Sequence, residues 1–220
     1  IEPARCTVGL STDGLLCVTH PDNRKSFPNV FLKGAAVDKT LAEALSDFHA
    51  ETVVIKGANA VDMQGNVGVV TAGFDGGTVP RIIGPVTSNG LKYITPVGLE
   101  KLVPSVPESC RAVGARNIDI SMGADFGMYC FSNTIVVTEL EAIKMLFGLS
   151  AVLVCCGGVG GNEGAVTLAV DGGETQIKAL VAFLENEIKG EPPVRGNKGI
   201  CADCRYKRCR YIGLKSEALP

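Results

Sequence analysis

Three cysteines close to the C-terminal end have a spacing that suits metal binding. They form the pattern Cys201-x-x-Cys204-x4-Cys209. Thiolates two residues apart can chelate one metal centre, as they do in zinc knuckles and iron–sulfur ligand sets. A fourth ligand would come from another cysteine, from a carboxylate such as Asp203, from a partner chain or from solvent. The sequence therefore predicts a zinc or iron–sulfur site, with a disulfide or thiols without metal as the alternative.

The segment that carries these cysteines is basic. Between residues 195 and 215 there are seven Lys and Arg residues and one acid, Asp203. Basic residues interleaved with Tyr206 and Tyr211 are typical of nucleic-acid-binding patches. A solvated segment whose positive charge balances thiolates explains the same composition. We favour this second interpretation and do not expect nucleic acid as a partner.

A second stretch with residues that could bind a ligand or do chemistry is the loop at residues 57–68, GANAVDMQGNVG. It follows the apolar run 51–56, which has the length and composition of a buried strand. In open α/β sheets, ligands bind beyond the C-terminal ends of the strands. A plain turn explains the same glycines and polar residues. As a ligand loop, it would bind through Gly57, Asn59, Gly65 and Asn66 and offer Asp62 as a catalytic group.

Three pieces in order, GANAVDMQGNVG, GFDGG and LKYITPVGLEKLVPS, resemble the superfamily of sugar-phosphate isomerases, DeoR-type sugar sensors and CoA-transferases. The piece VGLEKLVPS also resembles the lactate-utilisation (LUD) domains of that superfamily. The resemblance covers roughly residues 30–107. It implies an α/β core with a pocket for a phosphorylated sugar or a CoA-like acyl group.

The chain departs from the isomerases at the residues that would do the chemistry. They carry an acid where Asn59 stands, and an amide cannot take a proton from carbon or return one. Their Lys and Glu are missing from the glycine-rich loop 73–78, where Asp75 is the only acid. We therefore expect a binding loop first, and a non-catalytic sensor is an alternative. The resemblance implies ligand contacts at Gly76, Gly77 and Thr78, with Asp75 as a catalytic candidate.

A third glycine-rich loop occupies residues 157–164, GGVGGNEG. It does not match the dinucleotide-binding pattern G-x-G-x-x-G, because Glu163 stands at the third glycine and a strand pattern follows instead of a helix. A hairpin loop and an anion- or ligand-contacting loop both explain it. In the second case Gly158 and Gly160 would contact the ligand and Glu163 would be a catalytic candidate.

The elements that must position these loops alternate between strand and helix up to about residue 105. This alternation predicts a three-layer α/β fold with a mostly parallel sheet. After residue 115 the order predicts a smaller α+β unit of ferredoxin-like type. We therefore expect an α/β ligand-binding core at 1–115, an α+β unit at 116–190 that completes or caps it, and a linker with a Cys-rich tail at 191–220.

Periodicity and capping residues give the individual elements. Asp38 is expected to cap the first helix, and Thr138 is expected to form a capping box with Glu141. The predicted strands are 6–10, 15–19, 51–56, 91–95, 117–121, 151–156 and 165–171. The predicted helices are 38–48, 99–102, 138–147 and 174–189.

Bulk composition limits the classes of protein and partner. Hydrophobic residues make up 46% of the chain and the net charge is −2, which fits a folded protein without a field that attracts nucleic acid or anionic membranes. No apolar run approaches the length of a membrane span, about 20 residues. The odd number of cysteines, nine, with six in apolar contexts where they would be buried, favours a reducing cytoplasm. A homo-oligomer is compatible with these numbers.

Overall fold

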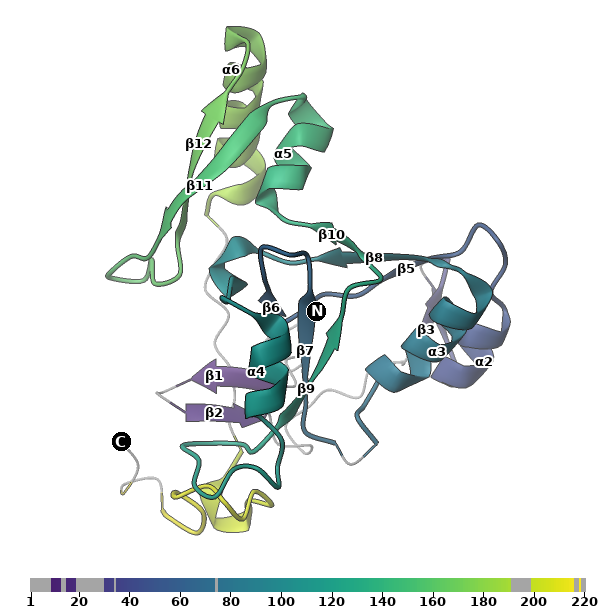
Figure 1. Cartoon of the computed structure of the whole chain (residues 1–220), viewed down its shortest axis with the longest axis vertical. Coiled ribbons are helices and arrows are strands. Elements are labelled where there is room, and N and C mark those ends of the chain that lie inside the picture. The colour runs from purple at the N-terminus through teal and green to yellow at the C-terminus, as the bar shows by residue number, and fades with distance from the viewer. Residues whose placement is uncertain are drawn as a thin grey trace.

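The computed structural model describes residues 9–12, 15–18, 30–33, 35–73, 75–190, 199–215 and 218. They form a mixed α/β fold with both parallel and antiparallel sheets (Figure 1). The strands are β1 Gly9–Thr12, β2 Leu15–Val18, β3 Val30–Leu32, β4 Ala35–Val37, β5 Val53–Ile55, β6 Ala60–Val61, β7 Val67–Thr71, β8 Lys92–Pro96, β9 Gly127–Phe131, β10 Ile135–Val137, β11 Ser150–Cys156 and β12 Val166–Asp171. The helices are α2 Leu41–Ser46, α3 Val79–Asn89, α4 Val106–Ala112, α5 Glu139–Phe147 and α6 Glu174–Phe183, with short helical turns η2 Leu99–Lys101, η3 Leu184–Ile188 and η4 Cys201–Asp203.

Two three-stranded sheets form the centre of the molecule. One is parallel, in the order β10-β8-β5, and the other is antiparallel, in the order β6-β7-β9. Strands β9 and β10 lie late in the chain, yet each adds an edge to a sheet begun by earlier strands. The predicted α/β class is confirmed in this general form, with a parallel sheet and an antiparallel sheet side by side.

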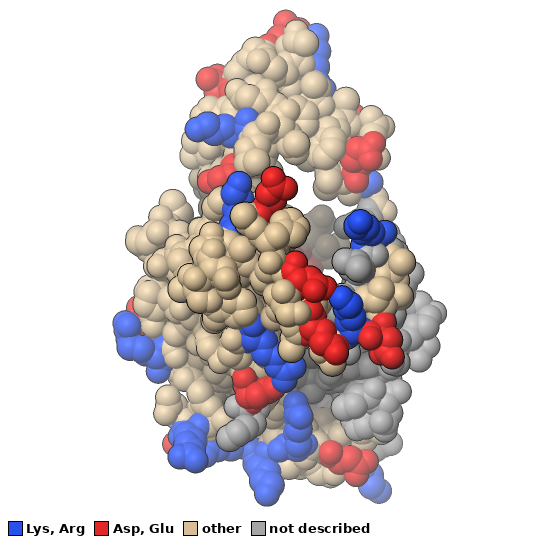
Figure 2. Space-filling model, turned by 90° about the vertical axis from the view of Figure 1, so that its right-hand side faces the viewer, with Lys and Arg blue, Asp and Glu red and all other residues tan. Residues whose placement is uncertain are grey.

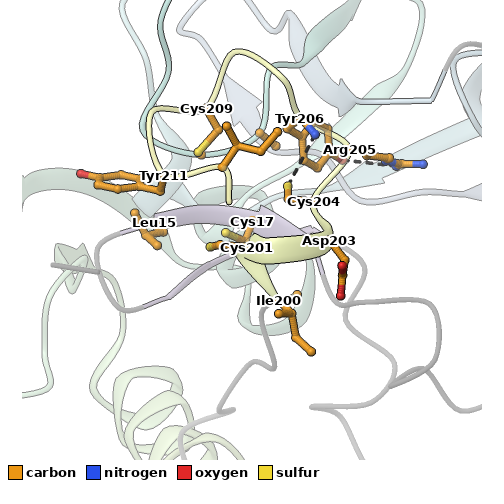
Figure 3. A pocket seen from close by; sticks show the side chains of 14 residues that line it. Leu15, Cys17, Ile200, Cys201, Asp203, Cys204, Arg205, Tyr206, Cys209 and Tyr211 are labelled. Atoms are coloured by element: carbon orange, nitrogen blue, oxygen red, sulfur yellow. Dashed lines mark hydrogen bonds between the residues drawn. The ribbon is translucent and has the colours of Figure 1, made fainter. Parts of the chain in front are cut away.

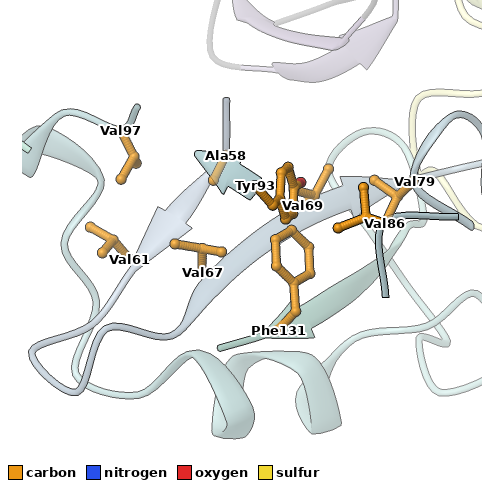
Figure 4. Close-up of a cluster of buried hydrophobic side chains, with 9 residues drawn as sticks. All are labelled: Ala58, Val61, Val67, Val69, Val79, Val86, Tyr93, Val97 and Phe131. Atoms are coloured by element: carbon orange, nitrogen blue, oxygen red, sulfur yellow. The ribbon is translucent and has the colours of Figure 1, made fainter. Parts of the chain in front are cut away.

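The main core lies between these sheets and helix α3 (Figure 4). Val67 and Val69 of β7 are buried there beside Tyr93 of β8. The ring of Tyr93 stacks on Phe131 of β9 with 5.5 Å between ring centroids. Strand β7 is buried on both faces over its first residues, which explains why its sequence is a continuous apolar run.

A second, smaller core belongs to the hairpin β11–β12 and helices α5 and α6, at the top of Figure 1. Ile143, Leu149 and Leu180 are its buried residues. Helix α5 begins at a capping box, because the Thr138 hydroxyl accepts from Leu140 N and the Glu141 carboxylate accepts from Thr138 N. The predictions for α5, β11, β12 and α6 are confirmed, and a π-helical turn, η3, follows α6.

Four predicted elements differ in the structure. The strand predicted at 6–10 is β1 Gly9–Thr12, with residues 6–8 outside the described part of the chain, and the helix predicted at 99–102 is the short 3-10 turn η2. The first helix begins at Leu41 and not near Asp38, because Thr40 is its N-cap and pairs with Glu43 in a capping box. Phe48 lies beyond its end. The alternating segment 117–121 is not a strand: Asn117 N donates to Gly114 O in a turn, and Ser121 makes only an isolated bridge. Its alternation reflects no buried face, since Ile120 is 76% exposed.

Several elements have weak sequence signals. Helix α3 contains Pro80 in its first turn and Pro85 inside, and it ends at Gly90 with φ +63°. Pro at the first turn costs no hydrogen bond, whereas internal Pro and Gly normally argue against a helix. Burial of Val79 and Val86 in the main core stabilises it nonetheless. Strands β3, β4, β6, β7, β9 and β10, as well as α4, were also not predicted.

Candidate metal centre and candidate ligand loops

The C-terminal segment 199–215 folds against the N-terminal hairpin β1–β2, and a cavity of about 250 Å³ lies between them. Four cysteines line this cavity. Three of them are the predicted ligands Cys201, Cys204 and Cys209, and the fourth is Cys17 of β2. Figure 3 draws the side chains of these four cysteines, one from β2 and three from the C-terminal segment.

Backbone hydrogen bonds shape the segment around the predicted ligands. The turn η4 closes with Cys204 N donating to Cys201 O at 3.3 Å, and Gly213 N donates to the same carbonyl at 2.8 Å. The amide of Tyr206 lies 3.5 Å from the Cys204 sulfur and donates to it. An N–H group aimed at a cysteine sulfur two residues earlier stabilises a thiolate ligand and tunes a metal centre that the thiolate binds.

Segment 121–124 connects the hairpin to the C-terminal segment. Ala124 N donates to Leu16 O at 2.6 Å on one side. On the other side Ser121 N donates to Arg208 O at 2.9 Å and Arg210 N donates to Ser121 O at 3.0 Å. A Cβ atom on Gly123 would lie 2.1 Å from Leu16 O, so only glycine permits this approach. Three distant parts of the chain therefore meet at the cysteine cavity.

The basic residues of this segment make specific contacts. Arg205 and Arg210 lie over the rings of Tyr206 and Tyr211, with 5.2 and 5.6 Å to the ring centroids. Arg208 donates to Ile118 O at 2.6 Å and to the carbonyl of Ala115. Figure 2 shows Lys and Arg side chains gathered at the lower end of the molecule, where Figure 1 places this segment. Of these basic residues, Arg205 also lines the cavity.

The arrangement offers thiol ligands without a closed coordination shell. Among the described residues, no three Cys, His, Asp or Glu side chains already converge on one point as metal ligands would. Cys201 and Cys204 are partly exposed to the cavity, and rotation about χ1 moves a sulfur between staggered positions. Ligation would therefore take side-chain rotation within the cavity.

The loop 57–68 is held by its own polar residues. The backbone N–H of Asn59 donates to Gly68 O at 2.7 Å, and the side-chain oxygen of Asn59 accepts from Val70 N at 3.0 Å. Both groups fix the start of β6 against β7. Gly65, with φ +79°, forms the turn that follows. The polar side chain of Asn59 thus has a structural role, and its predicted role in ligand binding stays a prediction.

Asp62 is the buried carboxylate of this loop, with 4% of its surface exposed. It accepts from the backbone N–H groups of Gln64, Asn66 and Val106 at 2.9–3.1 Å, and from the Asn66 side chain. It thereby closes the turn and caps the start of α4. Burial alone would raise the pKa of Asp62, but hydrogen bonds from Asn66, Val106 and Gln64 outweigh it and hold the pKa below its usual value. Such a carboxylate is ionised and fully engaged, which favours a structural role over proton transfer.

The loop 73–78 is also engaged internally. Asp75 pairs with Arg81 at 2.6 Å and accepts from Gly77 N. The Gly77 N–H and the Arg81 guanidinium hold the pKa of Asp75 below its usual value. A Cβ atom on Gly76 would lie 2.3 Å from the Tyr129 hydroxyl, so this glycine is required for packing on β9. Thr78 is the residue before α3, and its side chain makes no capping hydrogen bond.

The loop 157–164 forms the tip of hairpin β11–β12. Gly157 N donates to Ala165 O at 2.9 Å, and the Glu163 carboxylate accepts from Gly161 N. A Cβ atom on Gly158 would lie 1.9 Å from Asn162 O, while Gly160 has φ +65° and open space around it. A Cβ atom on Gly164 would lie 3.8 Å from that of Glu100. The base of the loop therefore adjoins η2, which follows β8.

The three predicted catalytic carboxylates do not share partners among the described residues. Asp62 bonds to the 64–66 turn and α4, Asp75 to α3, and Glu163 within its own loop. The structure thus brings the predicted metal ligands together at one cavity and distributes the predicted catalytic residues over three segments.

Cys17 is the cavity-lining cysteine that the sequence did not single out. Its strand-like context LLCVT suggested a thiol packed as a small hydrophobe. The only signal that could have pointed to it was that the three C-terminal cysteines lack a fourth ligand, which another cysteine of the chain could supply. The expectation that the scattered cysteines are buried is wrong for Cys130, Cys155 and Cys156, which are exposed. Strands β9 and β11 each present an outer face, so an apolar context did not imply burial.

No family model, curated protein or solved structure gives a significant match to the chain. The likeness of its loops to the sugar-isomerase and CoA-transferase superfamily therefore stays a prediction. None of the helices formed by the described residues has both the length and the apolar character that crossing a membrane requires.

Proposed function

We propose that this chain is a metal-binding protein whose centre is held by Cys201, Cys204 and Cys209, with zinc or an iron–sulfur cluster as the metal. The observation that carries this proposal is the common cavity lined by all three cysteines. The cysteines belong to, or pack against, the apolar cluster of Leu15, Ala124, Tyr206 and Tyr211. They also border a cavity, which the close packing of purely structural cysteines would not leave.

The surroundings of the cavity support the proposal. The N–H group of Tyr206 donates to the Cys204 sulfur, as expected for a thiolate ligand. Buried Tyr206 and Tyr211 keep part of the lining apolar. The four basic residues at 205, 207, 208 and 210 offset the negative charge that several thiolates would carry. A redox-linked accessory role follows if the metal is an iron–sulfur cluster, because such clusters exchange single electrons.

The test is metal analysis of the full chain purified without oxygen and without added chelator. We expect zinc or iron at a fixed ratio to protein, and loss of most of it in Cys201→Ser, Cys204→Ser and Cys209→Ser. The matched control is Cys155→Ser, since Cys155 is exposed and lies outside the cavity lining. Protein that contains neither metal, before or after anaerobic reconstitution with each, would refute the proposal.

A second candidate function is supported by the parallel sheet. Strands β5, β8 and β10 end at the same edge, with Gly57 following β5 there. The loop 157–164 reaches this edge, because Gly164 adjoins Glu100 and the Cys156 thiol donates to Leu99 O at 3.9 Å. A small-molecule site at this edge, on a three-layer isomerase or CoA-transferase type of fold with a ferredoxin-like unit as its cover, is our second proposal.

This second proposal is tested by thermal-shift measurements with sugar phosphates and CoA esters. We expect one ligand class to raise the melting temperature of the wild type, and the rise to shrink in Glu163→Gln. The control Glu185→Gln changes an acid in η3, outside the loop, and should keep the full rise. No shift with any ligand of either class would exclude these ligand classes.

A further inference from the structure

The fourth cysteine at the cavity comes from the other end of the chain. Cys17 lies on β2, and like Cys201, Cys204 and Cys209 it lines the cavity (Figure 3). Successive residues of a strand point to opposite faces. Leu15 and Cys17 therefore share the face that meets the C-terminal segment, and Leu15 is only 1% exposed there.

Backbone contacts of the hairpin fix the position of Cys17. Cys17 is paired with Leu10 in the hairpin β1–β2. Its neighbour Leu16 accepts a hydrogen bond from Ala124 N. Segment 121–124 in turn bonds to Arg208 and Arg210, which flank Cys209, so backbone contacts link β2 to the part of the chain that carries Cys209. A ligand in such a place is preorganised, because its backbone need not move to reach a metal centre.

We propose that Cys17 is the fourth ligand of the centre and that the centre is an iron–sulfur cluster. This inference rests on the proposed metal-binding function and names its ligand set and its type. Four cysteine thiolates are the ordinary ligand set of both two-iron and four-iron clusters. The hairpin supplies one ligand and the C-terminal segment supplies three.

The size of the cavity favours a cluster over a single ion. A structural zinc ion binds its thiolates at about 2.3 Å, so the four sulfurs surround it closely and no cavity separates them. The cysteines here border a space of about 250 Å³. In a cluster each thiolate can bind a different iron atom, so the sulfurs stand further apart around a polynuclear core.

The lining of the cavity is also suited to a cluster. Leu15, Tyr211 and Ile212 give it an apolar side, and limited contact with solvent protects a cluster and influences its potential. The cluster with four thiolates would be an anion. Arg205 also lines the cavity, and Arg208 and Arg210 flank Cys209. Their charge would favour the reduced form, which carries one more negative charge.

The experiment uses the full chain, reconstituted without oxygen with ferric iron, sulfide and dithiothreitol. Ferric iron supplies the oxidised iron of the core, and dithiothreitol reduces the part of it that a four-iron core needs as ferrous iron. Iron, acid-labile sulfide and zinc are measured, and the electron paramagnetic resonance spectrum is recorded before and after dithionite. Dithionite supplies one electron to the cluster, and no bond to protein forms or breaks. We expect two or four iron atoms per chain with an equal amount of sulfide, and a change of spin state on reduction.

The decisive variant is Cys17→Ser. We expect its iron and sulfide content to be lower than that of the wild type by a factor of about five or more, because the lost thiolate ligand contributes directly to the binding free energy. Cys155→Ser should match the wild type. Equal melting temperatures of metal-free wild type and metal-free Cys17→Ser would show that the hairpin still folds, so that the loss reports ligation. If Cys17→Ser is less stable without metal, Cys17→Ala and Leu16→Ala serve to separate folding from ligation: only Cys17→Ala should lose iron.

The possible failures are distinct. Full iron and sulfide in Cys17→Ser, with their loss in Cys204→Ser, would overturn the role of Cys17 and leave the metal function intact. One zinc per wild-type chain without sulfide would overturn the proposal that the centre is an iron–sulfur cluster and would also leave the metal function intact. A wild-type chain that binds neither metal would overturn the metal function itself.

Discussion

At the scale of single residues, Asp62 shows how a motif acid can serve the fold. Both of its carboxylate oxygens face N–H donors: one accepts from Gln64 and Asn66, and the other from Val106 and the Asn66 side chain. An aspartate that accepts from the amide two residues later forms an Asx turn. The same side chain also caps α4. The sequence pattern suggested chemistry at this position, and the contacts indicate that it organises the loop and its neighbouring helix.

Asp62→Asn is expected to lower the free energy of unfolding by about 1–3 kcal/mol at pH 7. An amide has one oxygen, so its NH₂ group must point at a backbone N–H donor. Chemical denaturation measures the change. The control Asp119→Asn alters an exposed acid and should have little effect.

The pH dependence of stability follows from the lowered pKa of Asp62. A carboxyl whose folded pKa lies below its unfolded value, about 3.9, stabilises the fold above that value. This contribution is lost as the pH falls through the folded pKa. The wild type should therefore lose stability below about pH 4 more steeply than Asp62→Asn does. Parallel stability curves for the two proteins would contradict the role assigned to Asp62.

At the scale of secondary structure elements, helix α5 depends on its N-terminal cap. Thr138 is 8% exposed, its hydroxyl accepts from Leu140 N, and it also contacts the Glu141 carboxylate. Helix α5 packs on β11 and supplies Ile143 to the smaller core. The cap thus links the start of the helix to the stability of the whole β11–β12 unit.

Thr138→Ala is expected to lower the free energy of unfolding by about 1 kcal/mol, the usual effect of removing a capping side chain. The control is Thr175→Ala in α6, where an exposed Thr inside a helix gives way to a better helix former. Thr175→Ala should be neutral or slightly stabilising. Equal effects of the two substitutions would show that the cap contributes nothing measurable.

At the scale of the whole molecule, the cysteine cavity depends on the meeting of the hairpin β1–β2, segment 121–124 and the C-terminal segment. Gly123 is where two of these parts approach each other closely, because its backbone contacts the backbone of Leu16 directly. This contact joins parts of the chain that are more than a hundred residues apart in sequence.

Gly123→Ala is expected to lower the free energy of unfolding by about 1–3 kcal/mol, since its methyl group overlaps Leu16 O. It should also lower the amount of bound metal, although it removes no ligand. Gly84→Ala is the control, because the space around Gly84 in α3 is open and Ala favours a helix. Normal metal content in Gly123→Ala would show that the centre forms without this contact.

Local patterns predicted the elements whose stability is local. The capping residues and helical spacing gave α5 and α6, and apolar runs gave β5, β8, β11 and β12. Helix α3 was missed because Pro85 and Gly84 argue against a helix, and its stability comes from Val79 and Val86 in the main core. Segment 117–121 was wrongly predicted as a strand, because alternation of residue types does not by itself supply a face to bury.

For the candidate site, the sequence by itself determined the Cys201–Cys204–Cys209 spacing and the charge around it, since both are properties of adjacent residues. Only the tertiary structure decided that Cys17 lines the same cavity and that Asp62 turns inward to hold its loop. The physical reason is the same in both cases. Contacts between residues far apart in the chain arise from the packing of whole elements, and the short-range spacing of residue types carries little information about that packing.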